Sequence, residues 1–143
     1  LFFLPILVII ILRIILFFKK DIITNILDRK HKIANKIANK KLRKASECIK
    51  NKNFEGFFEE TEKSLWGYFA DKFKVQIADL SKESVESYFN DNNIKKDVEI
   101  RFIELINHCE FARYSPSNNK DKQMSGILSS AKKIIIDVES ELK

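Results

Sequence analysis

The segment FEGFFEETEKSLWGYFADKF, residues 54–73, predicts an amphipathic helix, because its apolar residues recur at the three- and four-residue spacing of one helix face. The residues on that face are Phe54, Phe57, Phe58, Thr61, Leu65, Trp66, Phe69 and Phe73. We expect Trp66 and Tyr68 to pack in the core rather than to bind a ligand. Gly67 lies inside the segment, where glycine is unfavourable in a helix, and we expect it to allow close contact with another helix.

Helical patterns also occupy the sequence on both sides of this segment, over residues 21–51, 82–89, 94–114 and 121–142. Ser81 is placed to cap the helix over 82–89. With 3 Gly and 2 Pro in 143 residues, the chain has too few turn residues for strands and hairpins. The expected fold is all-α: one N-terminal transmembrane helix followed by a small bundle of about five helices. The helices over 21–51 and 54–73 are expected to form an antiparallel hairpin.

Residues 1–18 read LFFLPILVIIILRIILFF and contain one charged residue, Arg13. A helix of this length measures roughly 27 Å, just short of a hydrocarbon core of about 30 Å. We interpret it as a transmembrane helix. A signal-peptide core is the weaker alternative, because the visible positive charges follow the apolar run rather than precede it. A helix buried in so small a domain would not be apolar on all sides.

The positive charge of the chain is concentrated directly after this apolar run. Of the net charge of +6, residues 19–44 carry +8 and residues 45–143 carry −3. We therefore divide the chain into a transmembrane helix over 1–18, a basic juxtamembrane helix over 19–44 and a cytoplasmic helical domain over 45–143. Lysine and arginine beside a span mark its cytoplasmic side; the relevant residues are Lys19, Lys20, Arg29, Lys30 and Lys32. The alternative is that this stretch binds anionic lipid.

No sequence pattern indicates catalysis, a cofactor or a metal site. The three glycines are isolated, and the carboxylates are expected to be scattered over helix surfaces. Cys48 and Cys109 are far apart, which favours two free thiols in a reducing compartment. His108 and Cys109 are adjacent, so their side chains point about 100° apart along a helix and do not chelate one metal. A redox or metal enzyme built on His108 and Cys109 is the least favoured hypothesis.

The run C-E-F-A-R-Y-S-P at Cys109–Pro116, together with Leu65-Trp66-Gly67-Tyr68 and Asp71-Lys72, resembles the C-terminal end of the BatD family of bacterial oxygen-tolerance (aerotolerance) proteins. The resemblance extends over most of the chain, and the Cys109–Pro116 run is its most specific part. It implies a long extracytoplasmic region before the span. The chain begins at Leu1 rather than Met, so we expect it to be a piece of a longer protein.

The resemblance also implies a location and partners. These are the bacterial inner membrane, with MoxR-type AAA ATPases and membrane proteins carrying von Willebrand factor A domains as partners. The expected function is a non-catalytic, membrane-anchored interaction module linked to stress or oxygen tolerance. We expect no nucleic-acid partner, because the folded domain is not basic, and no small-molecule substrate.

The candidate partner-binding residues are Glu110, Phe111, Arg113 and Tyr114. Phe111 points away from the apolar stripe of its own helix, and Glu110 and Arg113 are spaced to pair with each other. One interpretation is a surface ion pair beside aromatic rings that the last helix covers. The other is a docking surface, because aromatic residues beside arginine are frequent interface anchors.

Overall fold

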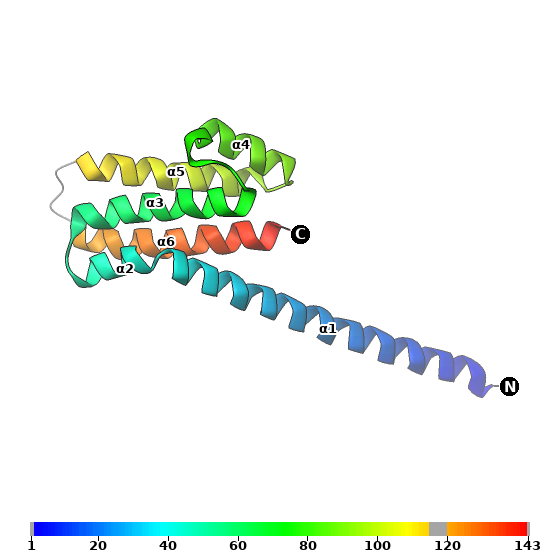
Figure 1. The fold of residues 1–143 in the computed structure, drawn as a ribbon. Helices are drawn as coiled ribbons and strands as arrows, with labels where there is room; N and C mark the ends of the chain where they lie inside the picture. The colour runs from blue at the N-terminus through cyan, green and yellow to red at the C-terminus, as the bar shows by residue number, and fades with distance from the viewer. Residues whose placement is uncertain (1, 115–119, 143) are drawn as a thin grey trace. The chain divides into compact units, whose positions relative to one another are not determined.

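The computed structural model describes residues 2–114 and 120–142, and every regular element within them is a helix, which confirms the all-α prediction (Figure 1). Leu1, the first residue of the predicted span, and the predicted helix end at 115–119 lie outside the described residues. The elements are α1 (Phe3–Lys41), α2 (Arg43–Lys50), α3 (Phe54–Phe73), the 3-10 helix η1 (Ile77–Asp79), α4 (Lys82–Asp91), α5 (Lys96–Tyr114) and α6 (Lys120–Glu141).

Local capping interactions explain where α3 and α4 begin and end. The Asn53 side chain accepts a hydrogen bond from the Gly56 backbone N–H at 3.1 Å, as an N-cap does. Lys74 ends α3 in the left-handed conformation, at φ 57°. Ser81 caps α4 as predicted, and it exchanges hydrogen bonds with Ser84 in a capping box.

The N-terminal unit comprises residues 1–33, and its described part lies within α1 after Phe2. Every residue from Phe3 to Phe18 except Pro5 and Arg13 is Leu, Ile, Val or Phe, and these side chains are exposed on all sides of the helix. No described helix is both long and apolar enough to cross a membrane. The transmembrane prediction for residues 1–18 is therefore not supported, since the helical apolar run ends at Phe18 and Lys19 and Lys20 follow at once.

The second compact unit, residues 34–143, is organised around α3. Helix α3 packs against α2, α5 and α6, and α4 packs on α5 (Figure 1). The contact between α2 and α3 agrees with the predicted hairpin, but the helix expected over 21–51 is interrupted. It breaks at Leu42, which separates α1 from α2 and is fully buried.

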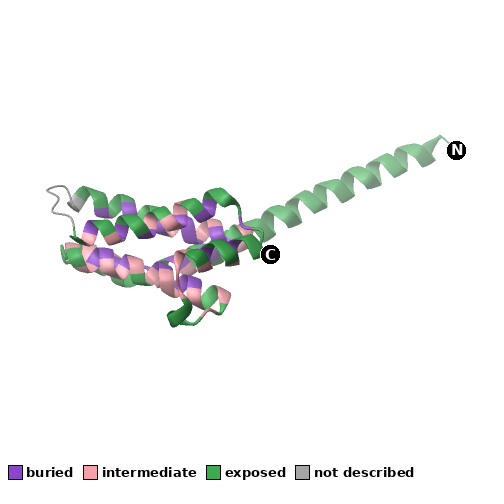
Figure 2. Cartoon of the chain, turned by 90° about the horizontal axis from the view of Figure 1, so that it is seen from above, coloured by how far each residue is buried: buried purple, intermediate pink, exposed green. Residues whose placement is uncertain are grey.

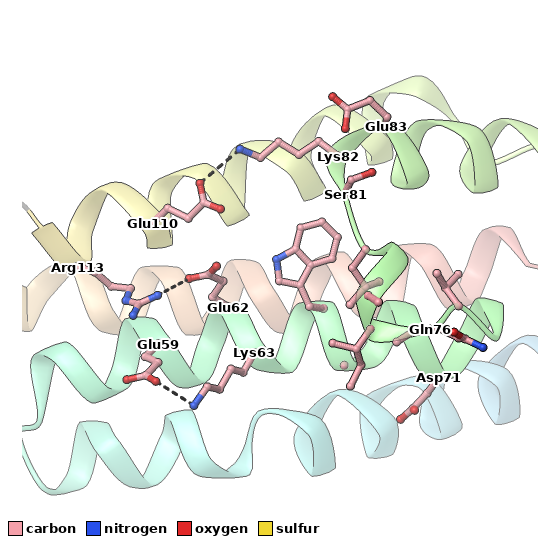
Figure 3. Close-up of a pocket in the computed structure, with 17 residues that line it drawn as sticks. Glu59, Glu62, Lys63, Asp71, Gln76, Ser81, Lys82, Glu83, Glu110 and Arg113 are labelled. Carbon is pink, nitrogen blue, oxygen red and sulfur yellow. Dashed lines mark hydrogen bonds and ion pairs between the residues drawn. The ribbon is translucent and has the colours of Figure 1, made fainter.

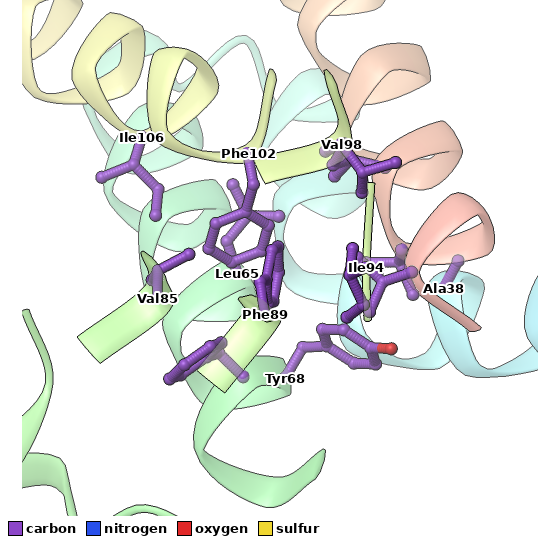
Figure 4. Packing of buried hydrophobic residues seen from close by; sticks show 14 of the residues in the cluster. Ala38, Leu65, Tyr68, Val85, Phe89, Ile94, Val98, Phe102 and Ile106 are labelled. Atoms are coloured by element: carbon purple, nitrogen blue, oxygen red, sulfur yellow. The ribbon is translucent and has the colours of Figure 1, made fainter. Parts of the chain in front are cut away.

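A cluster of aromatic rings joins three helices in the core of this unit (Figure 4). The ring of Phe69 on α3 lies 5.8 Å from Phe89 on α4 and 6.1 Å from Phe102 on α5, measured between ring centroids. The rings of Phe89 and Phe102 lie 5.5 Å apart. All three side chains are fully buried. Because aromatic side chains bury large apolar areas, this cluster fixes α4 against α3 and α5.

A second buried cluster occupies the other end of α3 and includes Phe57, Phe58 and Ala45. Cys109 on α5 is fully buried in it, as the apolar stripe of that helix predicts. Figure 2 shows how the buried residues line the inward faces of the helices in this unit. Cys109 therefore acts as a small core side chain.

One buried carboxylate links α3 to α6, contrary to the expectation that the carboxylates lie on helix surfaces. The Tyr68 hydroxyl donates a hydrogen bond to Glu139 Oε1 at 2.7 Å, and Lys72 Nζ donates one to Oε2 at 2.9 Å. Glu139 is 8% exposed. These two partners offset the cost of burying its charge. Glu99 is also buried, and within the described residues its Oε2 atom has no hydrogen-bond partner.

The end of α1 contributes to the same core. Ala34 and Ala38 are buried there, and Lys41 pairs with Asp71 of α3. Residues 34–44, which the sequence places in the juxtamembrane helix, thus supply part of the folded unit.

If the folded unit begins near Ala34, truncating a buried apolar side chain within it and an exposed one just before it should affect the free energy of unfolding differently. Leu42→Ala is expected to lower the free energy of unfolding by about 2–5 kcal/mol, because it leaves a cavity in the core. Ile33→Ala is the control, since Ile33 is 59% exposed and its truncation should change the value by less than about 0.5 kcal/mol. Urea unfolding of the full chain in neutral detergent, followed by circular dichroism, measures both. Equal effects would contradict a folded unit that begins near Ala34.

Candidate functional site

A groove of about 1140 Å³ runs along the outward face of α3 (Figure 3). One wall is α3 itself, which contributes residues at the spacing of a single helix face from Glu59 to Asp71. The opposite wall is the connection from Val75 to Ser81, the start of α4 and the last turn of α5. The groove therefore depends on the aromatic core that holds α4 beside α3.

The floor of the groove is apolar. Its lining includes Trp66, Ala70, Val75, Ile77, Ala78 and Leu80. Ile77 on η1 is 83% exposed, so a large apolar side chain stands unburied at the edge of the groove. Apolar surface at the base of a hollow is a usual character of binding sites.

The walls of the groove are rich in charge, and acids outnumber bases. The described lining has five carboxylates (Glu59, Glu62, Asp71, Glu83 and Glu110) and three basic side chains (Lys63, Lys82 and Arg113).

Each basic side chain in the lining is already paired with one of these acids. Lys63 lies 2.9 Å from Glu59 between nitrogen and oxygen, and its ammonium holds the pKa of that carboxyl below its usual range. Lys41 lowers the pKa of Asp71 in the same way. These two carboxylates are therefore ionised at neutral pH, and each is paired with a lysine. With Lys41 counted beside the three bases of the lining, five acids face four bases, so the net charge is −1.

Two residues of α3 behave differently from the sequence-based expectation. Gly67 was expected to allow close contact with another helix, but a side chain added there would meet nothing within 4 Å. The space above Gly67 is part of the groove. Tyr68 is buried as predicted, whereas Trp66 is half-buried: its ring packs edge-on against Phe69 and Phe102 and also lines the groove. The periodicity of α3 gave no sign of this second role.

The predicted pairing of Glu110 with Arg113 is wrong. Glu110 Oε2 lies 3.4 Å from Lys82 Nζ on α4, and Arg113 Nη1 lies 3.1 Å from Glu62 Oε2 on α3 (Figure 3). Glu110 thus connects α5 to α4, and Arg113 connects α5 to α3. Helical spacing allows a three-residue pair, but oppositely charged partners on adjacent helices are available here.

The predicted cover of Phe111 and Tyr114 is also wrong, because their exposed fractions are 72% and 81%. The Arg113 guanidinium lies over the Tyr114 ring at 5.6 Å from its centroid. The structure therefore leaves two aromatic side chains on the surface at the end of α5, beside an arginine that is held in place. This arrangement favours the docking interpretation of the four predicted residues.

The basic residues predicted to mark topology lie on α1, in the N-terminal unit. Lys19, Lys20, Arg29 and Lys32 are exposed, and Lys30 is partly buried. Ile22, Ile26 and Leu27 lie among them and are 55–59% exposed. The stretch over residues 19–33 is therefore amphipathic, and its apolar side chains are uncovered.

The cysteine and histidine side chains give little support to thiol or metal chemistry. Within the described residues, no group of three or more His, Cys, Asp or Glu side chains is arranged to hold a metal ion. Burial raises the pKa of Cys109 to about 12, with smaller contributions from the charges of Glu62 and Glu110. A thiol with such a pKa is protonated at neutral pH and is a poor nucleophile. Burial also raises the pKa of Cys48.

Comparison of the chain with protein families, curated proteins and solved structures found no match. The features of the chain that bear on its function are the groove, the exposed aromatic pair at the end of α5 and the two exposed parts of α1.

The two cysteines are expected to react at different rates in the folded chain. At pH 8, N-ethylmaleimide should modify the partly exposed Cys48, whereas Cys109 should react only after unfolding in urea. The reason is that the pKa of the native Cys109 thiol is about 12, whereas an unfolded cysteine ionises near pH 8.5. Mass spectrometry of the labelled protein counts the modifications, and Cys48→Ser should abolish native labelling. Rapid native labelling of Cys109 would contradict a buried thiol.

Proposed function

We propose that this chain is a non-catalytic, membrane-associated interaction module, in which residues 3–18 lie in the apolar part of a bilayer and the unit over 34–143 binds partner proteins. The observation that carries the proposal is the exposure of Leu, Ile, Val and Phe side chains on all sides of α1 from Phe3 to Phe18, interrupted only at Pro5 and Arg13. Each such side chain gains roughly 1.5–3 kcal/mol on full burial, so this helix favours an apolar environment.

The charge distribution supports one orientation. The concentrated positive charge directly after residue 18 favours a cytoplasmic location for the folded unit. Arg13 lies about 9 Å before Lys19 along the helix, within reach of the headgroup region for its long side chain. The proposed location is the bacterial inner membrane, with the C-terminal unit on the cytoplasmic side.

The proposed partners come from the resemblance to the BatD family: a MoxR-type AAA ATPase, or a membrane protein with a von Willebrand factor A domain. The exposed rings of Phe111 and Tyr114 beside Arg113 support a docking role at the end of α5. Coupling of an extracytoplasmic region to these partners, and a contribution to oxygen tolerance, rest on the resemblance alone.

A second candidate function is a lipid-surface module that acts through residues 19–33. It is favoured by the exposed apolar residues Ile22, Ile26 and Leu27, which lie among exposed lysines and an arginine. A basic amphipathic helix of this kind binds anionic headgroups. The two candidates differ in which part of α1 meets the lipid.

Vesicle flotation distinguishes the two candidates. We expect the full chain to float with neutral phosphatidylcholine vesicles, and a variant that lacks residues 3–18 not to float with them, because the apolar helix supplies the binding energy. Replacing Lys19, Lys20, Arg29 and Lys32 with Glu should leave neutral-vesicle binding unchanged. The matched control replaces four exposed lysines elsewhere with Glu: Lys50, Lys52, Lys122 and Lys133. Two results together would favour the lipid-surface module. The deletion variant would still float with anionic vesicles but not with neutral ones, and replacing the four basic residues with Glu would abolish that flotation.

The partner proposal is tested at the end of α5. The double variant Phe111→Ala, Tyr114→Ala should keep the melting temperature of the full chain, because both side chains are exposed. It should weaken binding to a purified MoxR-type ATPase or von Willebrand factor A domain protein from the same genome at least about tenfold, which corresponds to roughly 1.4 kcal/mol. Ile100→Ala on the same helix is the control, since Ile100 is 47% exposed. Unchanged binding by the double variant would place the docking surface elsewhere.

A further inference from the structure

The groove along α3 has the dimensions and lining that suit a bound helix. Its α3 wall extends from Glu59 to Asp71, which corresponds to roughly 18 Å of helix axis. Gly67 and Ala70 lie in the half of this wall nearer Asp71, and their small size leaves room for a second backbone. Trp66 and Ile77 supply apolar surface beside that space. Binding of an amphipathic helix to an apolar groove is a common mode of peptide recognition.

The charges of the groove specify the kind of helix that it suits. Glu59 and Glu62 lie toward one end of α3, and Asp71 lies toward the other (Figure 3). Each of these acids already pairs with one base of the chain, Lys63, Arg113 or Lys41. Because acids still outnumber bases by one, an occupant with an excess of basic residues would complement the groove.

The chain contains a segment with these properties. Residues 19–33 carry Lys19 and Lys20 at one end, Arg29 and Lys32 near the other, and an exposed apolar stripe between them. The segment is helical, measures roughly 22 Å and has a formal charge of +3. Residues 19–33 of the chain itself therefore suit the groove in length, charge and apolar surface.

We propose that residues 19–33 of one copy of this chain bind in the α3 groove of a second copy. Ile22, Ile26 and Leu27 would lie over Trp66 and Gly67, and the flanking basic residues would meet the acids at the two ends of the groove. If two copies exchange their segments reciprocally, the assembly closes as a symmetric dimer. The association goes beyond the proposed function and does not depend on membrane binding.

The chain provides its own reporter for this contact. Trp66 is the only tryptophan in the sequence, and it lines the groove. A synthetic peptide of residues 19–33 contains no tryptophan or tyrosine. We expect titration of this peptide into the full chain, diluted in neutral detergent until the dimer has dissociated, to shift Trp66 emission to shorter wavelength, because docking excludes water from the indole. Added salt should weaken the binding, since it screens the flanking charges.

Two glycine substitutions separate groove filling from general effects on the fold. Gly67→Leu fills the groove, whereas Gly126→Leu alters α6 at a distance from it. Both glycines lie inside helices, and an added Cβ meets nothing within 4 Å at either position, so both variants should fold. We expect Gly67→Leu to weaken peptide binding at least about tenfold and Gly126→Leu to leave it unchanged. A peptide carrying Ile26→Asp and Leu27→Asp should lose binding to the unchanged chain.

Self-association of the full chain provides the second measurement. We expect sedimentation equilibrium to show a concentration-dependent dimer that Gly67→Leu abolishes and Gly126→Leu preserves. Trp66 emission should move to longer wavelength on dilution, as the dimer dissociates. Emission that does not change with dilution, or equal effects of the two glycine variants, would overturn the proposal. A peptide that binds anionic vesicles but leaves Trp66 emission unchanged would overturn it in favour of lipid as the occupant.

Discussion

The contact of Phe69 with Phe89 and Phe102 is the interaction on which the rest of the folded unit depends. It is where α3, α4 and α5 meet, and all three rings are excluded from water. Helix α4 has only ten residues, too few to be stable alone in water. Its position beside α3 therefore comes from burying Val85 and Phe89 against this cluster. Removing the cluster would release α4 and the connection that precedes it.

The groove is a consequence of the same packing. Helix α3 turns one face toward the core, and its opposite face, with Trp66, Gly67 and Ala70, stays outside. Placing α4 against α5 brings Ser81 and Lys82 over that outer face and creates a wall. The ion pair of Arg113 with Glu62 joins the two walls, and that of Lys82 with Glu110 joins α4 to α5 within one wall. An apolar floor with charged sides results from the fold, although no short motif in the sequence encodes it.

The two proposals assign the exposed surfaces of α1 to different surroundings. Residues 3–18 carry apolar side chains on all sides, which suits a bilayer interior, whereas residues 19–33 carry a single apolar stripe with basic flanks. A stripe of this kind binds either an acidic groove or an anionic lipid surface, but its apolar side chains cannot be buried in both at once. Anionic lipid and a second copy of the chain would therefore compete for residues 19–33, and lipid composition would control association.

The sequence by itself determined the all-α class, the bounds of α3, the Ser81 cap and the burial of Cys109, because these features depend on periodicity and on neighbouring residues. Its prediction of partner-binding residues at the end of α5 stays a prediction, and it missed the ion-pair partners of Glu110 and Arg113. Only the tertiary structure decided that Arg113 pairs with Glu62, that Glu139 is buried beside Tyr68, and that Gly67 opens onto a groove. These contacts join helices that are distant in sequence. Helical spacing defines the face on which a side chain lies, but which helix packs against that face depends on how the whole core is filled.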